Sequence, residues 1–283
     1  MTIFIFRVKY FLSTQLFILY EKFLAVVSKR QRLKILFSKK NDWEELIRKG
    51  FKGLPHEVTF ASLTLANIKE CDMTIGLTYE DVLFLSEIKH NNYIPIPDTE
   101  CIKLCHDKYR FAKNLIEMGF GENIPLIDDN LSFPFILKKK LDSWGQNTHL
   151  VKNELQYQTL LNTIQKEDYY CQACILGRFE YAAHLLVVNK KIVHSLTIQH
   201  LFRSESAING KEDRISGIVS CKHLDTFTRI LNSIDYEGLC CVDYKIRNAK
   251  PMIFEINPRF GGSLQRFFFS FIRHLSIPVK STL

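Results

Sequence analysis

One stretch of this 283-residue chain constrains its fold more than any other, CCVDYKIRNAKPMIFEINPRF. Two runs of apolar and β-branched residues flank a polar turn at Asn248 and Ala249, a pattern that predicts a β-hairpin. In the second predicted strand, Glu255, Asn257 and Arg259 occupy every second position, so their side chains point to the same face. A carboxylate, an amide and a guanidinium on one face are unusual for a core. The hairpin is therefore the first candidate for a functional site.

The same hairpin carries a second acid. Asp243 lies in the first predicted strand, and we expect it across from the strand that holds Glu255 and Asn257. Two carboxylates and an amide oxygen are hard donors suited to Mg²⁺ or Mn²⁺, whose shell is completed by substrate phosphates and water. A charge-paired surface hairpin is the alternative, but the apolar residues around these acids make full exposure a poor explanation.

Strand and helix patterns alternate through the first hundred residues. We expect strands at 32–38, 72–78 and 93–97, and helices at 42–51 and 79–91. Alternation of this kind predicts a parallel sheet covered by helices, which is a small Rossmann-like layer. No glycine-rich dinucleotide fingerprint follows these strands, so we do not expect NAD.

The pattern changes after a long predicted helix at 98–118. From Phe133 onward, strand-like runs follow one another with short turns, and a single helix is expected within them. The expected strands are 133–140, 169–176, 180–198, 238–246 and 251–258, with a helix at 224–234. The predicted fold class is thus an α/β front followed by an α+β body.

The opening segment is apolar, but four charged side chains interrupt it. Its longest uncharged run, residues 10–20, is shorter than the roughly 20 residues that a membrane-spanning helix needs. We expect this segment to be buried as an N-terminal helix. Contact with a membrane surface or a partner, helped by the basic cluster that begins at Lys29, is the alternative.

Composition narrows the class of partner and the compartment. The formal charge of +8 and pI near 9.0 favour an anionic partner, which fits nucleic acid, anionic lipid or a phosphorylated small molecule. No strip of aromatic and basic residues is recognised, so nucleic acid is not expected. Eight cysteines without a recognisable signal peptide point to the reducing cytoplasm, and the pair Cys171 and Cys174 is interpreted as free thiols.

With these residues in view, the sequence resembles the ATP-grasp superfamily, especially the branch similar to the large subunit of carbamoyl-phosphate synthase and to carboxylate–amine ligases. That family has an acid on one strand and Glu-x-Asn-x-Arg on the next. The resemblance implies that Asp243, Glu255 and Asn257 hold the Mg²⁺ ions that bridge the phosphates of ATP. It also implies a catalytic role for Arg259, which would face the transferred phosphoryl group.

Upstream segments resemble further family motifs, in the family's order. The resemblance gives phosphate-binding roles to Lys108 and Lys138. Lys140 is an alternative to Lys138, because a lysine triplet stands where the family has one lysine followed by proline. Glu180 is the candidate for the ribose hydroxyls. The segment resembling the adenine-binding linker consists of Gln172, Ala173, Cys174 and Ile175.

The resemblance also implies domains. They are a Rossmann-like pre-ATP-grasp domain over residues 1–105 and an ATP-grasp domain over 106–283. Within the second, a lid subdomain is expected at about 125–180 and a metal-binding subdomain at about 181–265.

The implied activity is that of an ATP-dependent ligase. Such an enzyme activates a carboxylate as an acyl phosphate for attack by an amine, and it releases ADP and phosphate. A non-catalytic ATP-binding regulatory or assembly subunit is the alternative. The identities of the carboxylate and amine, and whether the chain forms a homodimer, stay open.

Two groups of residues keep two interpretations each. Side chains that either meet a substrate carboxylate or lie on a loop surface are His194, His200, Arg203 and Arg214. The aromatic run Phe267, Phe268 and Phe269 is assigned to the core in preference to a substrate site.

Overall fold

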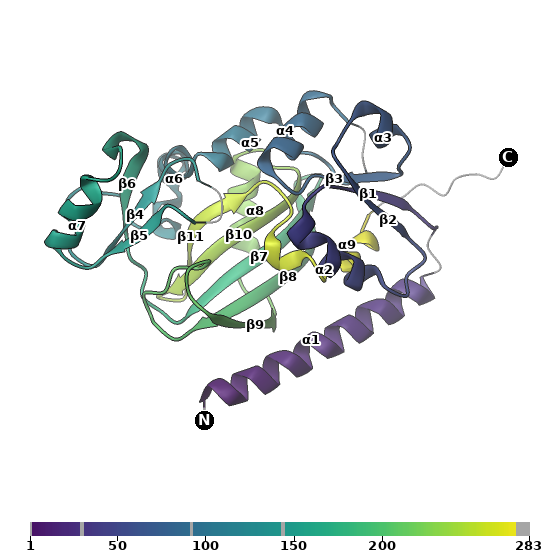
Figure 1. The fold of residues 1–283 in the computed structure, drawn as a ribbon, viewed down its shortest axis with the longest axis horizontal. Coiled ribbons are helices and arrows are strands. Elements are labelled where there is room, and N and C mark those ends of the chain that lie inside the picture. Colours follow the sequence, from purple (N-terminus) through teal and green to yellow (C-terminus); the bar gives the residue numbers. More distant parts are fainter. Residues whose placement is uncertain (1, 29–30, 91–92, 143–144, 276–283) are drawn as a thin grey trace.

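The computed structural model describes residues 2–28, 31–90, 93–142 and 145–275 (Figure 1). Its strands form three sheets: a front sheet in the order β2-β1-β3, a central sheet in the order β11-β10-β7-β8-β9, and a lid sheet in the order β5-β4-β6. The front sheet is parallel, whereas the other two are antiparallel. The α/β front and the α+β body expected from the sequence are confirmed.

The front layer is built around a buried central strand. Its elements are β1 (Lys34–Ser38), α2 (Asn41–Phe51), β2 (Glu57–Ala61), α3 (Leu65–Lys69), β3 (Met73–Ile75) and α4 (Tyr79–Glu87). Four of the five residues of β1 are buried, as expected for the middle of a covered parallel sheet. Helix α4 begins at a capping box in which Thr78 and Asp81 satisfy each other's backbone N–H groups.

The sequence prediction for this layer is correct in four places and wrong in one. Strands β1 and β3 and helix α4 fall within their predicted segments, and α2 begins one residue before its predicted start. Residues 93–97 form no strand, because Pro95 and Pro97 lack the N–H groups that a sheet ladder needs. Strand β2 and helix α3 were not predicted.

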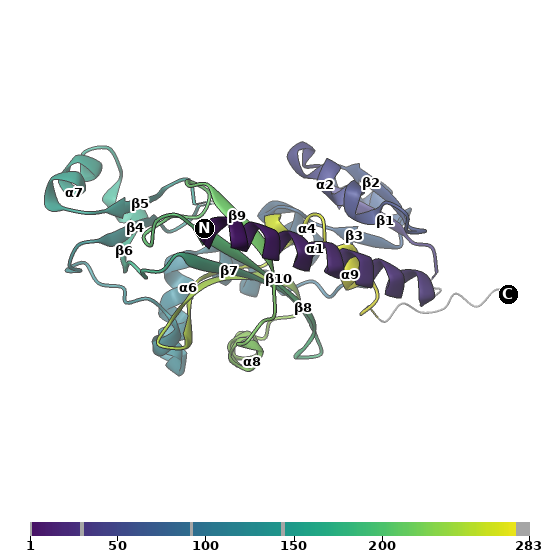
Figure 2. The same cartoon turned by 90° about the horizontal axis from the view of Figure 1, so that it is seen from below.

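The central sheet carries most of the body. Its strands are β7 (Phe179–Val188), β8 (Lys191–Phe202), β9 (Arg214–Val219), β10 (Gly238–Arg247) and β11 (Lys250–Asn257). Helices α5 (Thr99–His106), α6 (Lys108–Leu115) and α8 (Leu224–Ser233) contribute buried side chains to one core, which includes Phe111, Phe227 and Tyr244. Figure 2 shows α6 and α8 on the same side of the central sheet. A π-helical turn (Ile116–Phe120) and a 3-10 turn (Gly121–Asn123) follow α6.

The helix expected at 98–118 is two helices. Asp107 ends α5 and caps α6, since its Oδ1 accepts from the backbone N–H groups of Tyr109 at 3.1 Å and Arg110 at 2.9 Å. This cap makes Lys108 the first residue of α6, where its own N–H donates to the Lys140 carbonyl. The break between α5 and α6 therefore places the first residue of α6 in hydrogen-bond contact with Lys140, directly after β4 of the lid.

The lid is a small sheet at one end of the molecule. It contains β4 (Phe135–Lys139), β5 (Thr148–Val151) and β6 (Tyr169–Ala173), with α7 (Glu154–Leu161) and the 3-10 turn Lys166–Asp168 between the last two. Its own small core includes Phe135, Leu137, Val151 and Cys171. In Figure 1 it stands apart from the front layer, with the central sheet between them.

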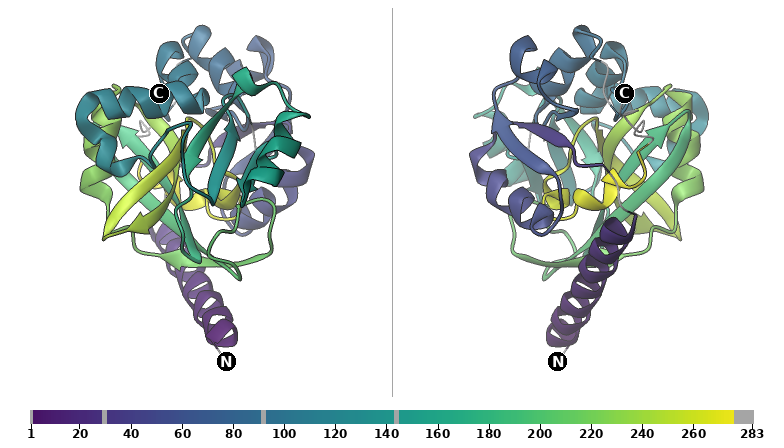
Figure 3. Two further views of the ribbon diagram at one scale, coloured as in Figure 1. Left: turned by 90° about the vertical axis from the view of Figure 1, so that its left-hand side faces the viewer. Right: turned by 90° about the vertical axis from the view of Figure 1, so that its right-hand side faces the viewer.

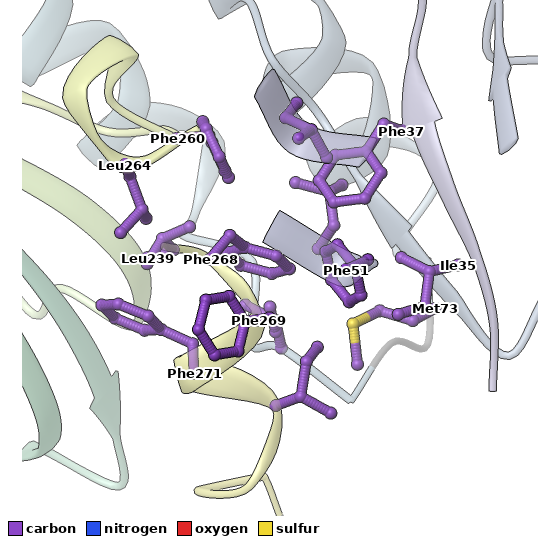
Figure 4. Close-up of a cluster of buried hydrophobic side chains, with 14 of the residues drawn as sticks. Ile35, Phe37, Phe51, Met73, Leu239, Phe260, Leu264, Phe268, Phe269 and Phe271 are labelled. Atoms are coloured by element: carbon purple, nitrogen blue, oxygen red, sulfur yellow. The ribbon is translucent and has the colours of Figure 1, made fainter. Parts of the chain in front are cut away.

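The C-terminal segment joins the front layer to the central sheet. After the 3-10 turn Gly262–Leu264, helix α9 (Phe269–Ile272) places aromatic rings against the front strands (Figure 4). Phe268 is fully buried and its ring packs edge-on against Phe37. Phe269 is also buried and Phe267 partly so, which confirms the assignment of this run to the core.

The N-terminal helix α1 (Thr2–Val27) is not buried, which corrects the prediction from the sequence. It lies on the outside of the molecule, along β9 and α9 (Figures 1 to 3). Of its described side chains, only Tyr10 and Glu21 are buried. By length and composition it is a candidate membrane span, the one such helix among the described residues. Charged side chains divide this helix into short uncharged runs, and for that reason no membrane span was expected from the sequence.

Candidate active site

The hairpin predicted from the sequence forms the floor of the site. Strands β10 and β11 pair so that Asp243 lies directly opposite Glu255, with a bulge immediately after Asp243. The turn at Asn248 and Ala249 has φ values of 50° and 61°, the left-handed conformation of a tight hairpin turn. The pairing brings the two acids together as expected.

Asn257 joins the two acids. Its amide nitrogen donates to Asp243 Oδ2 at 3.0 Å and to Glu255 Oε1 at 3.1 Å. Its amide oxygen accepts from Arg259 Nη2 at 3.2 Å, and the other end of that guanidinium donates to the Phe260 carbonyl at 3.0 Å. The face predicted from the two-residue spacing is therefore a connected hydrogen-bonded group.

Two buried lysines approach the same carboxylate from different elements. Lys108, at the start of α6, places Nζ 3.0 Å from Glu255 Oε2, and Lys138, on β4, lies 3.7 Å from that oxygen. Lys138 also donates to the Phe254 carbonyl at 3.0 Å. Both lysines are nearly excluded from solvent. Lys140 instead donates to the Glu167 carbonyl and lies over the Tyr109 ring, away from these acids.

The pKa values of Glu255 and Asp243 shift in opposite directions. Burial would raise the pKa of Glu255, but Lys108 and Lys138 outweigh it and hold that pKa well below its usual range. Burial raises the pKa of Asp243, and the negative charges of Glu255 and Glu180 raise it further. Asp243 thus lies where a cation would relieve electrostatic repulsion.

The opposite end of the site lies where the lid meets the central sheet. Gln172 is the next-to-last residue of β6, and its buried Nε2 has no hydrogen-bond partner among the described residues. Residues 173–175 follow it along the wall, and Glu180 lies near the start of β7. Burial raises the pKa of Glu180 to about 7, an effect that Lys245 opposes.

One cavity of about 510 Å³ connects both ends. Every site residue that was predicted from the sequence lines it: Lys108, Lys138, Gln172, Ala173, Cys174, Ile175, Glu180, Asp243, Glu255, Asn257 and Arg259. Lys140 does not line it. The structure brings the predicted residues together, and the roles given to them by resemblance stay predictions.

Of the four residues considered for substrate contacts, two line the cavity and two lie outside it. His200 and Arg214 line the cavity, and His200 is buried with its Nδ1 2.7 Å from Ser216 Oγ. His194 instead stacks on His274 beside the C-terminal aromatic cluster, and Arg203 is exposed outside the cavity.

Lys245 is a cavity residue that the sequence reasoning missed. It is buried, and its Nζ donates to the Ile175 carbonyl at 3.2 Å and the Glu205 carbonyl at 3.3 Å. The available signal was its spacing, since it follows Asp243 by two residues on β10 and can share a face with it. Lys245 fixes the linker to the loop that follows β8.

Gly261, in the loop after β11, leaves no room for a side chain. A Cβ at this position would lie 2.4 Å from His184 Cε1 and 2.9 Å from Cys241 Cβ. His184 is fully buried, its pKa is lowered to about 3 by burial, and its Nε2 lies 2.8 Å from Ser263 Oγ. The loop after β11 therefore depends on a neutral histidine beneath it.

The donor set fits a divalent metal ion of the Mg²⁺ type. Among the described residues, no three His, Cys, Asp or Glu side chains gather as a metal-binding group. The cluster here offers instead two carboxylates and the amide of Asn257, whose oxygen would face a metal ion once the amide turned from its contacts with the two acids. These are oxygen donors of the kind Mg²⁺ takes when phosphates complete its shell. The raised pKa of Asp243 supports this fit, because a bound cation would favour the ionised carboxylate.

The fold and the cavity define a class of protein in which a cavity lies between a small antiparallel lid and a larger antiparallel sheet. The model of the ATP-grasp domain family matches residues 105–263, which is more than half of the chain. The chain therefore belongs to the ATP-grasp domain family, as the sequence motifs indicated. No curated protein matches it in sequence.

Solved structures share the fold. A D-alanine–D-alanine ligase from Bacillus anthracis is 12% identical with a TM-score of 0.56, over 83% of this chain and 89% of that one. An L-amino acid ligase from Bacillus licheniformis is 13% identical with a TM-score of 0.60, over 85% and 70%. A carboxyaminoimidazole ribonucleotide synthase from Aspergillus clavatus, complexed with ATP, is 15% identical with a TM-score of 0.59, over 88% and 79%. These low identities show a shared architecture.

Proposed function

We propose that this protein is an ATP-dependent ligase that joins a carboxylate to an amine. The carboxylate oxygen attacks the γ-phosphorus of ATP, ADP leaves, and an acyl phosphate forms. The amine then attacks the acyl carbon, phosphate leaves with the C–O bonding pair, and the amine gives up a proton as the amide forms. Phosphorylation makes the carboxylate oxygen a leaving group, so no enzyme nucleophile is needed.

One observation carries the proposal: Lys108, Lys138 and Arg259 converge with two carboxylates in a single cavity. Phosphoryl transfer depends on positioning and on cations around the phosphate oxygens, and it asks for little covalent chemistry from the protein. Arg259 adds a positive charge to those of the two lysines, and it would stabilise the negative charge that moves from ATP to the acyl phosphate.

Each cavity residue is proposed to contact a different part of ATP or the metal ion. Gln172 and residues 173–175 are proposed to hold the adenine edge, and Glu180 the ribose. Lys108 and Lys138 would bind the phosphates, releasing Glu255 from its ion pairs. Asp243, Glu255 and Asn257 would hold Mg²⁺ or Mn²⁺, which would neutralise phosphate charge. Arg259 would contact the transferred phosphoryl group.

We also propose the domain division on which this assignment depends. Residues 1–105 would form the pre-ATP-grasp domain and 106–283 the ATP-grasp domain, with the lid at about 125–180 and the metal-binding part at about 181–265. All eight cysteines are free thiols, which supports a cytoplasmic location for the catalytic body.

The alternative is an ATP-binding regulatory or assembly subunit without turnover. Arg259 argues against it, because a protein that only binds ATP does not need a guanidinium beside the metal-binding acids in addition to the two lysines. A screen of carboxylate and amine pairs for ADP release tests the choice. Arg259→Ala should keep ATP affinity but lower turnover about 10²- to 10³-fold. ATP binding without ADP release for any pair would favour the subunit.

A further inference from the structure

The outer side of α1 is an unusually large apolar surface. Eleven of its exposed apolar side chains are 43% to 72% accessible: Phe4, Ile5, Val8, Phe11, Leu12, Leu16, Leu19, Tyr20, Phe23, Val26 and Val27. Spacings of three and four residues place them on one side of a helix that is 26 residues, or about 39 Å, long. Apolar patches of this extent mark interaction sites. We call these residues the α1 outer face.

The inner side of α1 fixes the helix to the body. The ring of Tyr10 packs so closely on β9 that a Cβ at Gly217 would lie 2.3 Å from it, and its hydroxyl donates to Gln199 at 2.6 Å. Glu21, 4% exposed, accepts two hydrogen bonds from Arg273 at 2.7 and 2.9 Å. Helix rotation that buried the outer face would break these contacts, so the outer face needs an external partner.

The exposed charged side chains of α1 are basic. Glu21 is the only acid within α1, and it is turned inward. At the C-terminal end, Lys22 donates to the Lys52 carbonyl, and its pKa is lowered by burial and by the nearby charges of Arg266 and Lys52. Lys9 is exposed near the other end. An apolar stripe with cations at both ends is complementary to an anionic lipid surface.

We propose that α1 lies in the interface of an anionic lipid bilayer, parallel to its plane, with the outer face among the upper acyl chains. To span the bilayer, α1 would have to leave the body, which would break the Glu21–Arg273 ion pair and the contacts of Tyr10. A second copy of the chain would place its own basic residues, among them Lys9 and Lys22, close to those of the first copy, and like charges would repel. The proposal does not depend on the ligase activity, because α1 contributes no residue to the cavity.

Flotation of the full chain with vesicles tests the proposal. The probes are vesicles of phosphatidylcholine alone and of phosphatidylcholine with phosphatidylserine. We expect the chain to float with the phosphatidylserine vesicles and to bind less as salt increases. No flotation with these vesicles would overturn the proposal.

Two kinds of variant separate the apolar and the basic contributions. Leu16→Glu should lower affinity for phosphatidylserine vesicles at least about tenfold, because it removes a leucine that the acyl chains would bury and adds a negative charge facing anionic lipid. Leu155→Glu is the matched control, since Leu155 is an exposed leucine of α7, away from α1, and it should bind as the wild type does. Lys52→Glu with Arg266→Glu should remove most of the preference for phosphatidylserine.

Other outcomes would reassign the face. If sedimentation shows a dimer that Leu16→Glu dissociates, while vesicles bind both forms equally weakly, the occupant is a second copy. If alkaline carbonate fails to release the chain from membranes, α1 spans the bilayer. Both results would overturn the proposal, whereas release by carbonate together with loss of binding in Leu16→Glu would support it.

Discussion

The ammonium group of Lys108 lies 3.0 Å from the carboxylate of Glu255, across the junction between α6 and the central sheet. Lys138 reaches the same carboxylate from the lid. One acid therefore holds two lysines that come from separate elements. A polyphosphate entering the cavity would compete with Glu255 for both lysines. A divalent metal would then neutralise the negative charge of Glu255 in their place. Nucleotide and metal binding should consequently support each other.

Lys138→Ala should weaken ATP binding roughly 10- to 100-fold, because a charge-assisted bond contributes about 1.5 to 3 kcal/mol. Lys140→Ala is a matched control two residues along the chain, where the lysine contacts the Glu167 carbonyl outside the cavity. It should keep ATP affinity within about twofold of the wild type. Calorimetric titration of both variants with ATP decides between them, and a loss confined to Lys140→Ala would move the phosphate role to that residue.

Removal of divalent metal should reduce ATP affinity, since the negative charges of Asp243 and Glu255 would then face the phosphates uncompensated. Asp243→Asn should keep the fold but lose most of the difference between ATP binding with Mg²⁺ and with EDTA. The measurement is ATP affinity in both conditions, with circular dichroism as the control for folding. Equal ATP affinity of the wild type with Mg²⁺ and with EDTA would contradict the assignment of a metal site.

Glu180 should make stability depend on pH. Burial raises its pKa from 4.5 to about 7, so the folded chain binds this proton more tightly than the unfolded chain does. Its stabilising contribution is full below pH 4.5 and is lost as pH rises to about 7. Glu180→Gln should therefore gain, relative to the wild type, about 3 kcal/mol in free energy of unfolding across that window.

Urea unfolding of Glu180→Gln between pH 4.5 and pH 8 checks this expectation. Glu117→Gln, at an exposed position of the π-helical turn, is the control and should follow the wild type at every pH. Parallel curves for Glu180→Gln and the wild type would show that Glu180 titrates as an ordinary exposed acid.

Gly261→Ala should destabilise the loop after β11, because the new methyl group would lie 2.4 Å from His184 Cε1. Overpacking of this kind costs about 1 to 3 kcal/mol. Adding His184→Ala makes room for the methyl group, so the double variant should be more stable than the sum of the two single changes predicts. Thermal unfolding of the four proteins measures this coupling, and strict additivity would mean that the loop moves aside.

The sequence by itself determined the elements whose patterns are local. Alternating side chains predicted the hairpin and the opposed positions of Asp243 and Glu255, because strand pairing follows from a period of two and a tight turn. The order of motifs predicted the ATP-grasp fold and the residues that line its cavity. Apolar aromatic side chains also predicted that Phe268 and Phe269 belong to the core.

Tertiary structure decided what depends on contacts between distant segments. Which lysine of the triplet lines the cavity depends on how the lid packs against β11, and no local pattern carries that information. Lys245 became recognisable only when the Ile175 and Glu205 carbonyls came within reach of it. The exposure of α1 was decided in the same way, since an apolar helix is buried only where the rest of the chain offers a surface, and here that surface covers only one side.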